Sequence, residues 1–146
     1  MALNRAQAKE IIDVPPEKFF EVVADFEKYP EFIPEVKRAK VLEKKGNKLK
    51  VEYEVSMIKT IRYTLELTLE PPNRLSWTLA EKGFFKQNDG AWELKSIDGG
   101  KRTEATYTVE IAFGILVPKA IIKTLVSQNL PQMLKRFKER AESIYA

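Results

Sequence analysis

The sequence predicts a single α+β domain, residues 1–146, in which a long C-terminal helix packs against an antiparallel sheet. After Pro118, apolar residues recur at steps of three and four, which places them on one face of a helix. Through most of residues 36–113, apolar and polar residues alternate, as in strands with one buried face. Helices and strands are thus segregated along a chain long enough for one core, which is typical of an α+β domain.

The N-terminal segment, residues 4–14, also alternates and is predicted to form the first strand. Ala6, Ala8 and Glu10 share one side of this strand, and the small alanines leave space for a neighbouring element. Glu10 is the exception in the pattern, because a buried carboxylate needs a partner. Either this is an edge strand with Glu10 partly hydrated or ion-paired, or Glu10 is a polar group at the end of a cavity.

Two short helices are predicted after the first strand. The first begins at Pro15-Pro16-Glu17, since proline is accepted in a first helical turn and an acid favours the positive end of the helix dipole. Asp25 is a candidate N-cap for the second helix, and Pro30 and Pro34 limit its length.

Six alternating segments then predict consecutive antiparallel strands. Turn-forming residues separate several of them, at Gly46-Asn47, Pro71-Pro72-Asn73 and Asp98-Gly99-Gly100. A sheet of this size twists and curls, and a single helix across its concave side cannot fill it, so we expect a cavity between sheet and helix. The predicted strands are residues 36–45, 49–57, 61–69, 75–79, 92–94 and 105–113.

The C-terminal helix is predicted from Pro118 to Ala146. Pro118 suits its first position, where the missing N–H has no intrahelical acceptor. Pro131 lies inside the periodic pattern and removes an intrahelical hydrogen bond, so we expect a kink or bulge near residues 129–130.

The same helix carries the formal net charge of +4, because cations and acids balance in the preceding residues. Either its basic face is a solvated outer surface with cations near a helix C-terminus, or it contacts anionic lipid or RNA phosphate. DNA is not expected as a partner. The candidate surface-binding cations are Lys119, Lys123, Lys135, Arg136, Lys138 and Arg140.

The chain contains no cysteine and no histidine. This composition excludes disulfides, thiolate nucleophiles and serine–histidine dyads, and it argues against zinc, copper or haem ligation. We therefore expect no metal and no cofactor. General acid–base chemistry would have to use groups such as Glu10, Tyr53 or Tyr63, with burial shifting a pKa toward neutrality.

Targeting signals are also not evident in the sequence. No apolar run approaches the ~18–20 residues needed to span a membrane, and residues 1–13 lack the apolar segment of a signal peptide. We expect a cytoplasmic protein.

Residues 14–34 resemble the opening of a known family. The stretch Val14-Pro15-Pro16-Glu17 and the later Asp25-Phe26-Glu27-Lys28-Tyr29-Pro30-Glu31-Phe32-Ile33-Pro34 are similar to the START-related helix-grip proteins of the polyketide cyclase/dehydrase family. Within it the chain most resembles the branch of coenzyme-Q-binding proteins and the ribosome-association toxin RatA. The resemblance implies a seven-stranded antiparallel sheet curled around the long helix, with an apolar tunnel for a hydrophobic ligand, no metal and no fixed catalytic residues.

The inner-facing residues predict the lining of that tunnel. Aromatic rings with a polar tip and flexible methionines suit a flat or prenylated apolar ligand such as a polyprenyl quinone. The alternative is that these side chains simply fill the core. The candidate ligand-binding residues are Tyr53, Met57, Tyr63, Trp77, Trp92 and Tyr107 from the strands, with Val126, Leu130, Met133 and Phe137 from the helix.

The sequence is therefore compatible with three functions. The first is binding or transport of a hydrophobic small molecule, without catalytic residues. The second is ribosome association through the basic C-terminal helix, as the resemblance to RatA implies. The third, ranked last because no pair of titratable groups is well placed on the inner face, is a cyclase or dehydratase.

Overall fold

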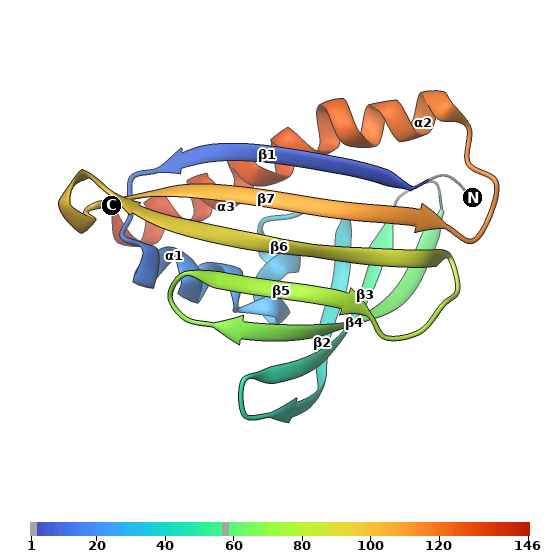
Figure 1. The fold of residues 1–146 in the computed structure, drawn as a ribbon, viewed down its shortest axis with the longest axis horizontal. Coiled ribbons are helices and arrows are strands. Elements are labelled where there is room, and N and C mark those ends of the chain that lie inside the picture. The colour runs from blue at the N-terminus through green and yellow to red at the C-terminus, as the bar shows by residue number, and fades with distance from the viewer. Residues whose placement is uncertain (1–2, 57–58) are drawn as a thin grey trace.

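A seven-stranded antiparallel sheet curls around the C-terminal helix in the computed structural model, which describes residues 3–56 and 59–146 (Figure 1). This confirms the predicted α+β class and the predicted order of elements. The strands are β1 (Asn4–Ile12), β2 (Val36–Lys45), β3 (Lys48–Ser56), β4 (Thr60–Glu70), β5 (Arg74–Leu79), β6 (Phe85–Ile97) and β7 (Arg102–Phe113). The helices are α1 (Pro16–Val23), the 3₁₀ helices η1 (Phe26–Glu31) and η2 (Asp98–Gly100), α2 (Lys119–Thr124), the π-helical turn η3 (Leu125–Asn129) and α3 (Leu130–Tyr145).

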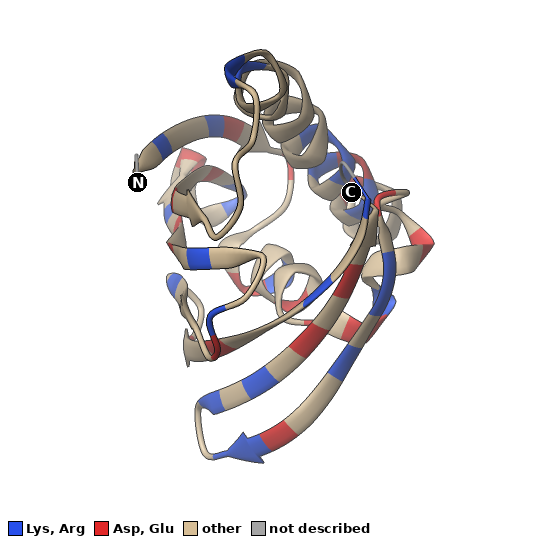
Figure 2. Cartoon of the chain, turned by 90° about the vertical axis from the view of Figure 1, so that its right-hand side faces the viewer, with Lys and Arg blue, Asp and Glu red and all other residues tan. Residues whose placement is uncertain are grey.

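The strand order is β1-β7-β6-β5-β4-β3-β2, so β1 and β2 form the two edges. Of the two alternatives for the first strand, its position at a sheet edge is confirmed. Each later strand pairs with the one before it, and β1 closes the order beside β7, with Ala8 opposite Tyr107. Figure 2 shows the resulting curvature, with the sheet bending around the helices that lie on its concave side.

The two short helices form where they were predicted, with one difference. In α1, Pro16 lies in the first turn, and Phe19 and Val23 are fully buried. The second is the 3₁₀ helix η1, and Asp25 precedes it without a side-chain capping hydrogen bond. The prediction that Asp25 caps this helix is therefore wrong in its chemistry, although its position is right.

The C-terminal helix is divided by the π-helical turn η3, which ends one residue before α3 begins and two before Pro131. In a regular α-helix, the N–H of residue 131 would donate a hydrogen bond to the carbonyl of Ser127. Pro131 has no N–H, and its ring would collide with the Ser127 carbonyl. Widening the preceding turn relieves both problems. The predicted bulge at this proline is confirmed.

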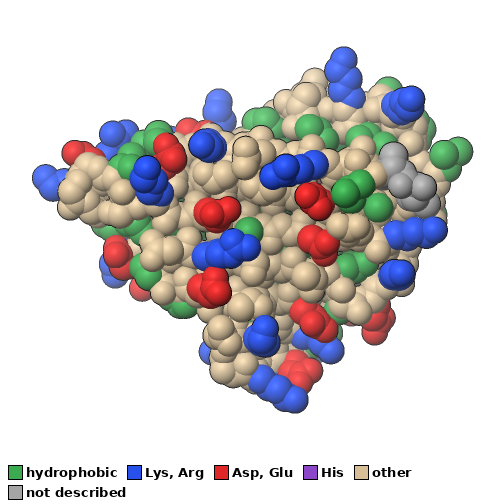
Figure 3. All heavy atoms as spheres, in the orientation of Figure 1, with side chains coloured by type: hydrophobic (Ala, Val, Ile, Leu, Met, Phe, Trp, Pro, Cys, Tyr) green, Lys and Arg blue, Asp and Glu red, His purple; other side chains and the backbone are tan. Residues whose placement is uncertain are grey.

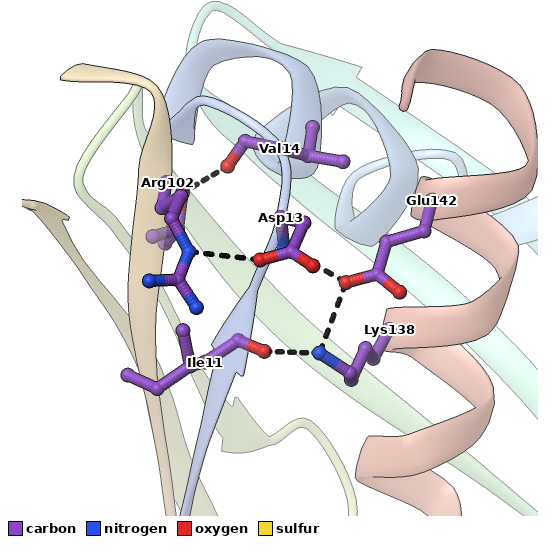
Figure 4. A network of polar contacts seen from close by, with 7 residues as sticks. Ile11, Asp13, Val14, Arg102, Lys138 and Glu142 are labelled. Carbon is purple, nitrogen blue, oxygen red and sulfur yellow. Dashed lines mark hydrogen bonds and ion pairs between the residues drawn. The ribbon is translucent and has the colours of Figure 1, made fainter. Parts of the chain in front are cut away.

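A polar network fixes the C-terminal half of this helix to the sheet (Figure 4). Lys138 Nζ donates to the backbone carbonyl of Ile11 at 2.5 Å and pairs with Glu142 at 3.0 Å. Glu142 accepts the backbone N–H of Asp13 at 2.8 Å, and Arg102 Nε donates to the Asp13 carboxylate at 2.8 Å. These bonds join α3, the end of β1 and the start of β7.

Packing holds the same half of the helix. Leu134, Phe137 and Ala141 are buried against α1 and the sheet. The ring of Phe137 meets Trp92 at a centroid distance of 5.1 Å and Tyr29 at 5.2 Å, both edge to face. The C-terminal half of the helix therefore belongs to the core, whereas all the residues of α2 and η3 are at least partly exposed.

Candidate ligand-binding site

The concave face of the sheet carries a continuous group of aromatic rings. Tyr53 on β3 stacks on Tyr63 on β4 at 5.4 Å between centroids. Tyr107 on β7 lies 5.3 Å from Trp77 on β5 and 5.0 Å from Trp92 on β6. The structure thus brings together five of the six candidate residues on the strands; the sixth, Met57, lies outside the described residues.

Three of these tyrosines have hydroxyl groups that no protein atom uses. Among the described residues, the hydroxyls of Tyr53, Tyr63 and Tyr107 have no hydrogen-bond partner. A hydroxyl that is buried without any partner costs about 1–3 kcal/mol, so these three groups are candidates for bonding a water or a bound molecule.

Tyr29 behaves differently from these three. Its hydroxyl donates to the backbone carbonyl of Val23 at the end of α1. Its ring faces Tyr53 at 6.3 Å and Phe137 at 5.2 Å. Tyr29 is therefore a structural neighbour of the site, and it provides an internal comparison for the three free hydroxyls.

The C-terminal helix is more deeply buried in its C-terminal half than in α2 and η3. Phe19, Trp92 and Phe137, which meet beside α1, are buried. The apolar residues of α2, η3 and the start of α3 that pack against the core are only partly buried. These residues are Ile121, Ile122, Leu125, Leu130 and Met133.

Trp77 is held as a fixed wall of this site. Its indole N–H donates to the buried Asn88 side chain at 3.1 Å. A Cβ atom on Gly90, the residue opposite Trp77 on β6, would lie 2.4 Å from the indole ring and 2.4 Å from the Thr108 carbonyl oxygen. Only glycine leaves room for the ring there, so Trp77 supplies apolar surface while its N–H stays occupied.

Burial sets the protonation of the tyrosines. It raises the pKa of Tyr53, Tyr63 and Tyr107, and that of Tyr29, above the ordinary value of a tyrosine. These hydroxyls are therefore neutral over the physiological range and can donate or accept a hydrogen bond. Glu10, the other catalytic candidate, is partly buried on the edge strand opposite Ala105.

The candidate helix residues are divided between the two halves of the helix. Phe137 is buried in the core, and Leu130 and Met133 are partly buried against it, whereas Val126 is 39% exposed. Leu134, which the periodicity did not select for the lining, is 2% exposed.

The six candidate cations have different surroundings. Lys119, Lys123 and Lys135 are exposed, and Arg136 is half-buried. Lys138 belongs to the polar network beside Ile11, as described above. Arg140 pairs with Glu31 at 2.7 Å and lies over the Phe32 ring, and its hydrogen bond lowers the pKa of Glu31.

Other features of the surface do not suit an apolar ligand. A hollow of about 390 Å³ on the outer face of β3, β4 and β5 is lined mainly by polar side chains, including Lys48, Lys50 and Glu66. Within residues 3–56 and 59–146, no group of acidic side chains is arranged to hold a metal ion. No helix in that part of the chain is long and apolar enough to cross a membrane.

Comparison with known proteins identifies relatives along nearly the whole chain. The model of the family "Polyketide cyclase / dehydrase and lipid transport" matches residues 12–138. The ribosome association toxin RatA of Pseudomonas aeruginosa is 27% identical over 140 residues, covering 95% of this chain and 96% of that protein. The mitochondrial coenzyme Q-binding protein COQ10 homolog B of Xenopus laevis is 24% identical over 132 residues, covering 88% of this chain and 54% of that protein.

Solved structures share the same fold. The Zhui aromatase/cyclase from Streptomyces sp. R1128 superposes with a TM-score of 0.86 at 18% identity, covering 97% of this chain and 94% of that one. A START superfamily protein from Mycobacterium smegmatis gives 0.83 at 16% identity, covering 96% and 98%. At these identities the structures establish the helix-grip fold alone.

The buried tyrosines predict a specific alkaline response. In the unfolded chain tyrosines ionise near pH ~10, whereas the four buried ones stay protonated in the native protein, so unfolding releases protons above that pH. The free energy of unfolding is expected to fall by about 1 kcal/mol per buried tyrosine between pH ~10 and ~11. Tyrosinate absorbance and far-ultraviolet circular dichroism, followed together, test this. Ionisation of the buried tyrosines before any loss of secondary structure would contradict it.

Proposed function

Because the chain belongs to the polyketide cyclase/dehydrase and lipid-transport family, we propose that it binds a hydrophobic small molecule between its sheet and its C-terminal helix. The observation that carries this proposal is the set of three tyrosine hydroxyls, on an otherwise apolar inner face, that have no hydrogen-bond partner among the described residues. Buried polar groups in native proteins are nearly always paired. A bound molecule with a polar head would provide the missing partners, and the aromatic rings would contact its apolar body.

The surroundings of the tyrosines favour a neutral ligand. Among the described residues, the only polar side chains that are fully buried are Asn88 and Thr103, and neither is charged. A carboxylate or phosphate head placed there would have no buried cation to offset its desolvation. Carbonyl or hydroxyl oxygens need only the neutral donors that Tyr53, Tyr63 and Tyr107 supply.

A polyprenyl quinone is the ligand that we propose within this class. Its ring carbonyls accept hydrogen bonds from neutral hydroxyls, its flat head suits the stacked rings of Tyr53 and Tyr63, and its tail is apolar. The similarity to a coenzyme Q-binding protein supports this choice. Catalysis as a cyclase or dehydratase ranks below it, because tyrosines held neutral by burial are poor general bases.

Removing single hydroxyls tests the proposed site. The variants Tyr53→Phe, Tyr63→Phe and Tyr107→Phe should each weaken quinone binding by about five- to tenfold for every hydroxyl that bonds the ligand, since a neutral hydrogen bond contributes ~1 kcal/mol. Their thermal stability should not fall, because no protein partner is lost. Both tryptophans line the inner face, so quenching of their fluorescence by a short-chain polyprenyl quinone measures the affinity.

Tyr29→Phe is the matched control. It removes the hydroxyl that bonds the Val23 carbonyl, so it should lower stability by ~1 kcal/mol and leave the affinity almost unchanged. Failure of quinones to quench the wild-type protein, or equal affinity in all four variants, would contradict the proposed site.

Ribosome association is a second candidate function, favoured by a separate observation. Lys119, Lys123 and Lys135 project from the C-terminal helix as exposed cations, and they have no ion-pair partner among the described residues. Exposed cations along a helix can bind RNA phosphates in a salt-dependent manner. The similarity to RatA, over 95% of this chain, supports this candidate.

Charge reversal of the free cations tests ribosome binding. The triple variant Lys119→Glu/Lys123→Glu/Lys135→Glu should abolish cosedimentation with ribosomes at low salt, and added salt should weaken the wild-type interaction. Lys138 is left unchanged because it bonds Ile11. Reversal of Lys40 and Lys44 on the edge strand β2 is the control. Cosedimentation that resists both salt and the triple variant would exclude this surface.

A further inference from the structure

Two apolar side chains project into solvent between β7 and α2. Leu116 is 97% exposed and Ile115 is 41% exposed. At the same end of the molecule, Leu3 precedes β1 and is 52% exposed. Exposed leucines are common when scattered singly, but an almost fully exposed leucine beside a second apolar residue on a short connection is not required by the fold.

Contacts on both sides of Ile115 and Leu116 fix the connection between β7 and α2, so that these two side chains point outward. The backbone N–H of Gly114 donates to the Phe84 carbonyl at 2.7 Å. A Cβ on Gly114 would lie 2.1 Å from the Gly83 carbonyl oxygen, so only glycine permits this close approach. On the other side Val117 is 8% exposed and α2 begins two residues later. Burial of the tip inside the protein would require breaking these anchors.

Positive charge adjoins the apolar tip. No acidic residue occurs between Glu110 and Glu139 in the sequence. Lys119 and Lys123 are one helical turn apart and both exposed, while Ile121 and Ile122 between them turn toward the core. Figure 3 shows hydrophobic and basic side chains next to each other over the end of the molecule where α2 lies.

The neighbouring loop contributes both signs of charge. Gly83, which touches Gly114, follows Glu81 and Lys82, and both of these side chains are exposed. The charges of Glu81 and Lys82 cancel, so the net charge near the apolar tip is that of Lys119 and Lys123 on α2.

We propose that Ile115, Leu116, Lys119 and Lys123 form a docking surface for an anionic lipid bilayer. The two apolar side chains enter the boundary between headgroups and acyl chains, while the lysines meet the lipid phosphates. The surface lies beside the partly exposed inner-face residues of α2, Ile121 and Ile122. Docking would therefore bring α2, which covers one end of the proposed ligand site, to the membrane, a consequence that rests on the proposed ligand-binding function.

A bilayer fits this surface better than RNA does. RNA phosphates would use Lys119 and Lys123 but would leave Leu116 in water. In a bilayer, the apolar acyl chains and the negatively charged phosphates lie only a few ångströms apart. Leu116 can therefore enter the apolar layer while Lys119 and Lys123 contact the phosphates. Apolar insertion and phosphate contact can be tested separately, because Ile115 and Leu116 provide the first and Lys119 and Lys123 provide the second.

Vesicle flotation with the full chain tests the proposal. The wild type should bind phosphatidylcholine vesicles that contain phosphatidylglycerol and should bind pure phosphatidylcholine weakly. Ile115→Ser/Leu116→Ser should reduce binding by about tenfold or more, from the loss of buried apolar area. Lys119→Glu/Lys123→Glu should reduce it by at least about 25-fold, at about fivefold for each cation removed.

Leu42→Ser and Lys40→Glu/Lys44→Glu on β2 are matched controls, since Leu42 is 47% exposed and both lysines are exposed. They should bind as the wild type does. Leu116→Ser alone, at a fully solvated position, keeps the test valid if the double variant misfolds. Thermal melts show whether each variant is folded.

Absence of wild-type binding to the anionic vesicles would overturn the proposal. Vesicle binding that is lost in the lysine variant but unchanged in the serine variants would also overturn it, because the contact would then be electrostatic alone, without insertion of the apolar tip. Quinone quenching in solution, measured on the same variants, should be unchanged. A docking failure with intact quenching is thus distinguishable from failure of the ligand-binding proposal.

Discussion

One helix must cover a curved sheet that is broader than the helix, and it is fixed to that sheet at one end. Lys138 bonds the Ile11 carbonyl and Phe137 packs edge to face on Trp92, so the C-terminal half of the helix joins the core. The π-helical turn before Pro131 separates this half from α2. The apolar residues of α3 that meet α1 are consequently buried, whereas those of α2 and η3 remain partly exposed.

The tyrosines of the inner face differ in their hydrogen bonding. The Tyr29 hydroxyl donates to a backbone carbonyl, as polar groups in a core usually do. The hydroxyls of Tyr53, Tyr63 and Tyr107, which burial keeps neutral, have no hydrogen-bond partner among the described residues. An apolar face with free neutral donors suits an uncharged oxygen-bearing ligand, and the exposed tip at Leu116 lies on the connection that leads into the same helix.

Much of this was predictable from local patterns, and the failures have a physical cause. Period-two alternation placed Tyr53 and Tyr63 on one face correctly, and Pro131 predicted the bulge. The π turn breaks the helical period, so extrapolation through it selected Val126, which is exposed. Within α3 the pattern offered both Met133 and Leu134, and the buried one is Leu134. The role of Lys138 depends on a carbonyl 127 residues away in sequence, and Tyr29 lies in a 3₁₀ segment without periodicity.

The central claim is that the inner face holds a neutral apolar molecule whose oxygens bond the three tyrosines. Native mass spectrometry of the protein purified from its own cells, followed by identification of the released molecule, tests it most directly. The account predicts a bound, uncharged, oxygen-bearing lipid such as a polyprenyl quinone, displaced when the protein unfolds. A protein that is empty, or that carries a fatty acid or another charged lipid, would contradict it.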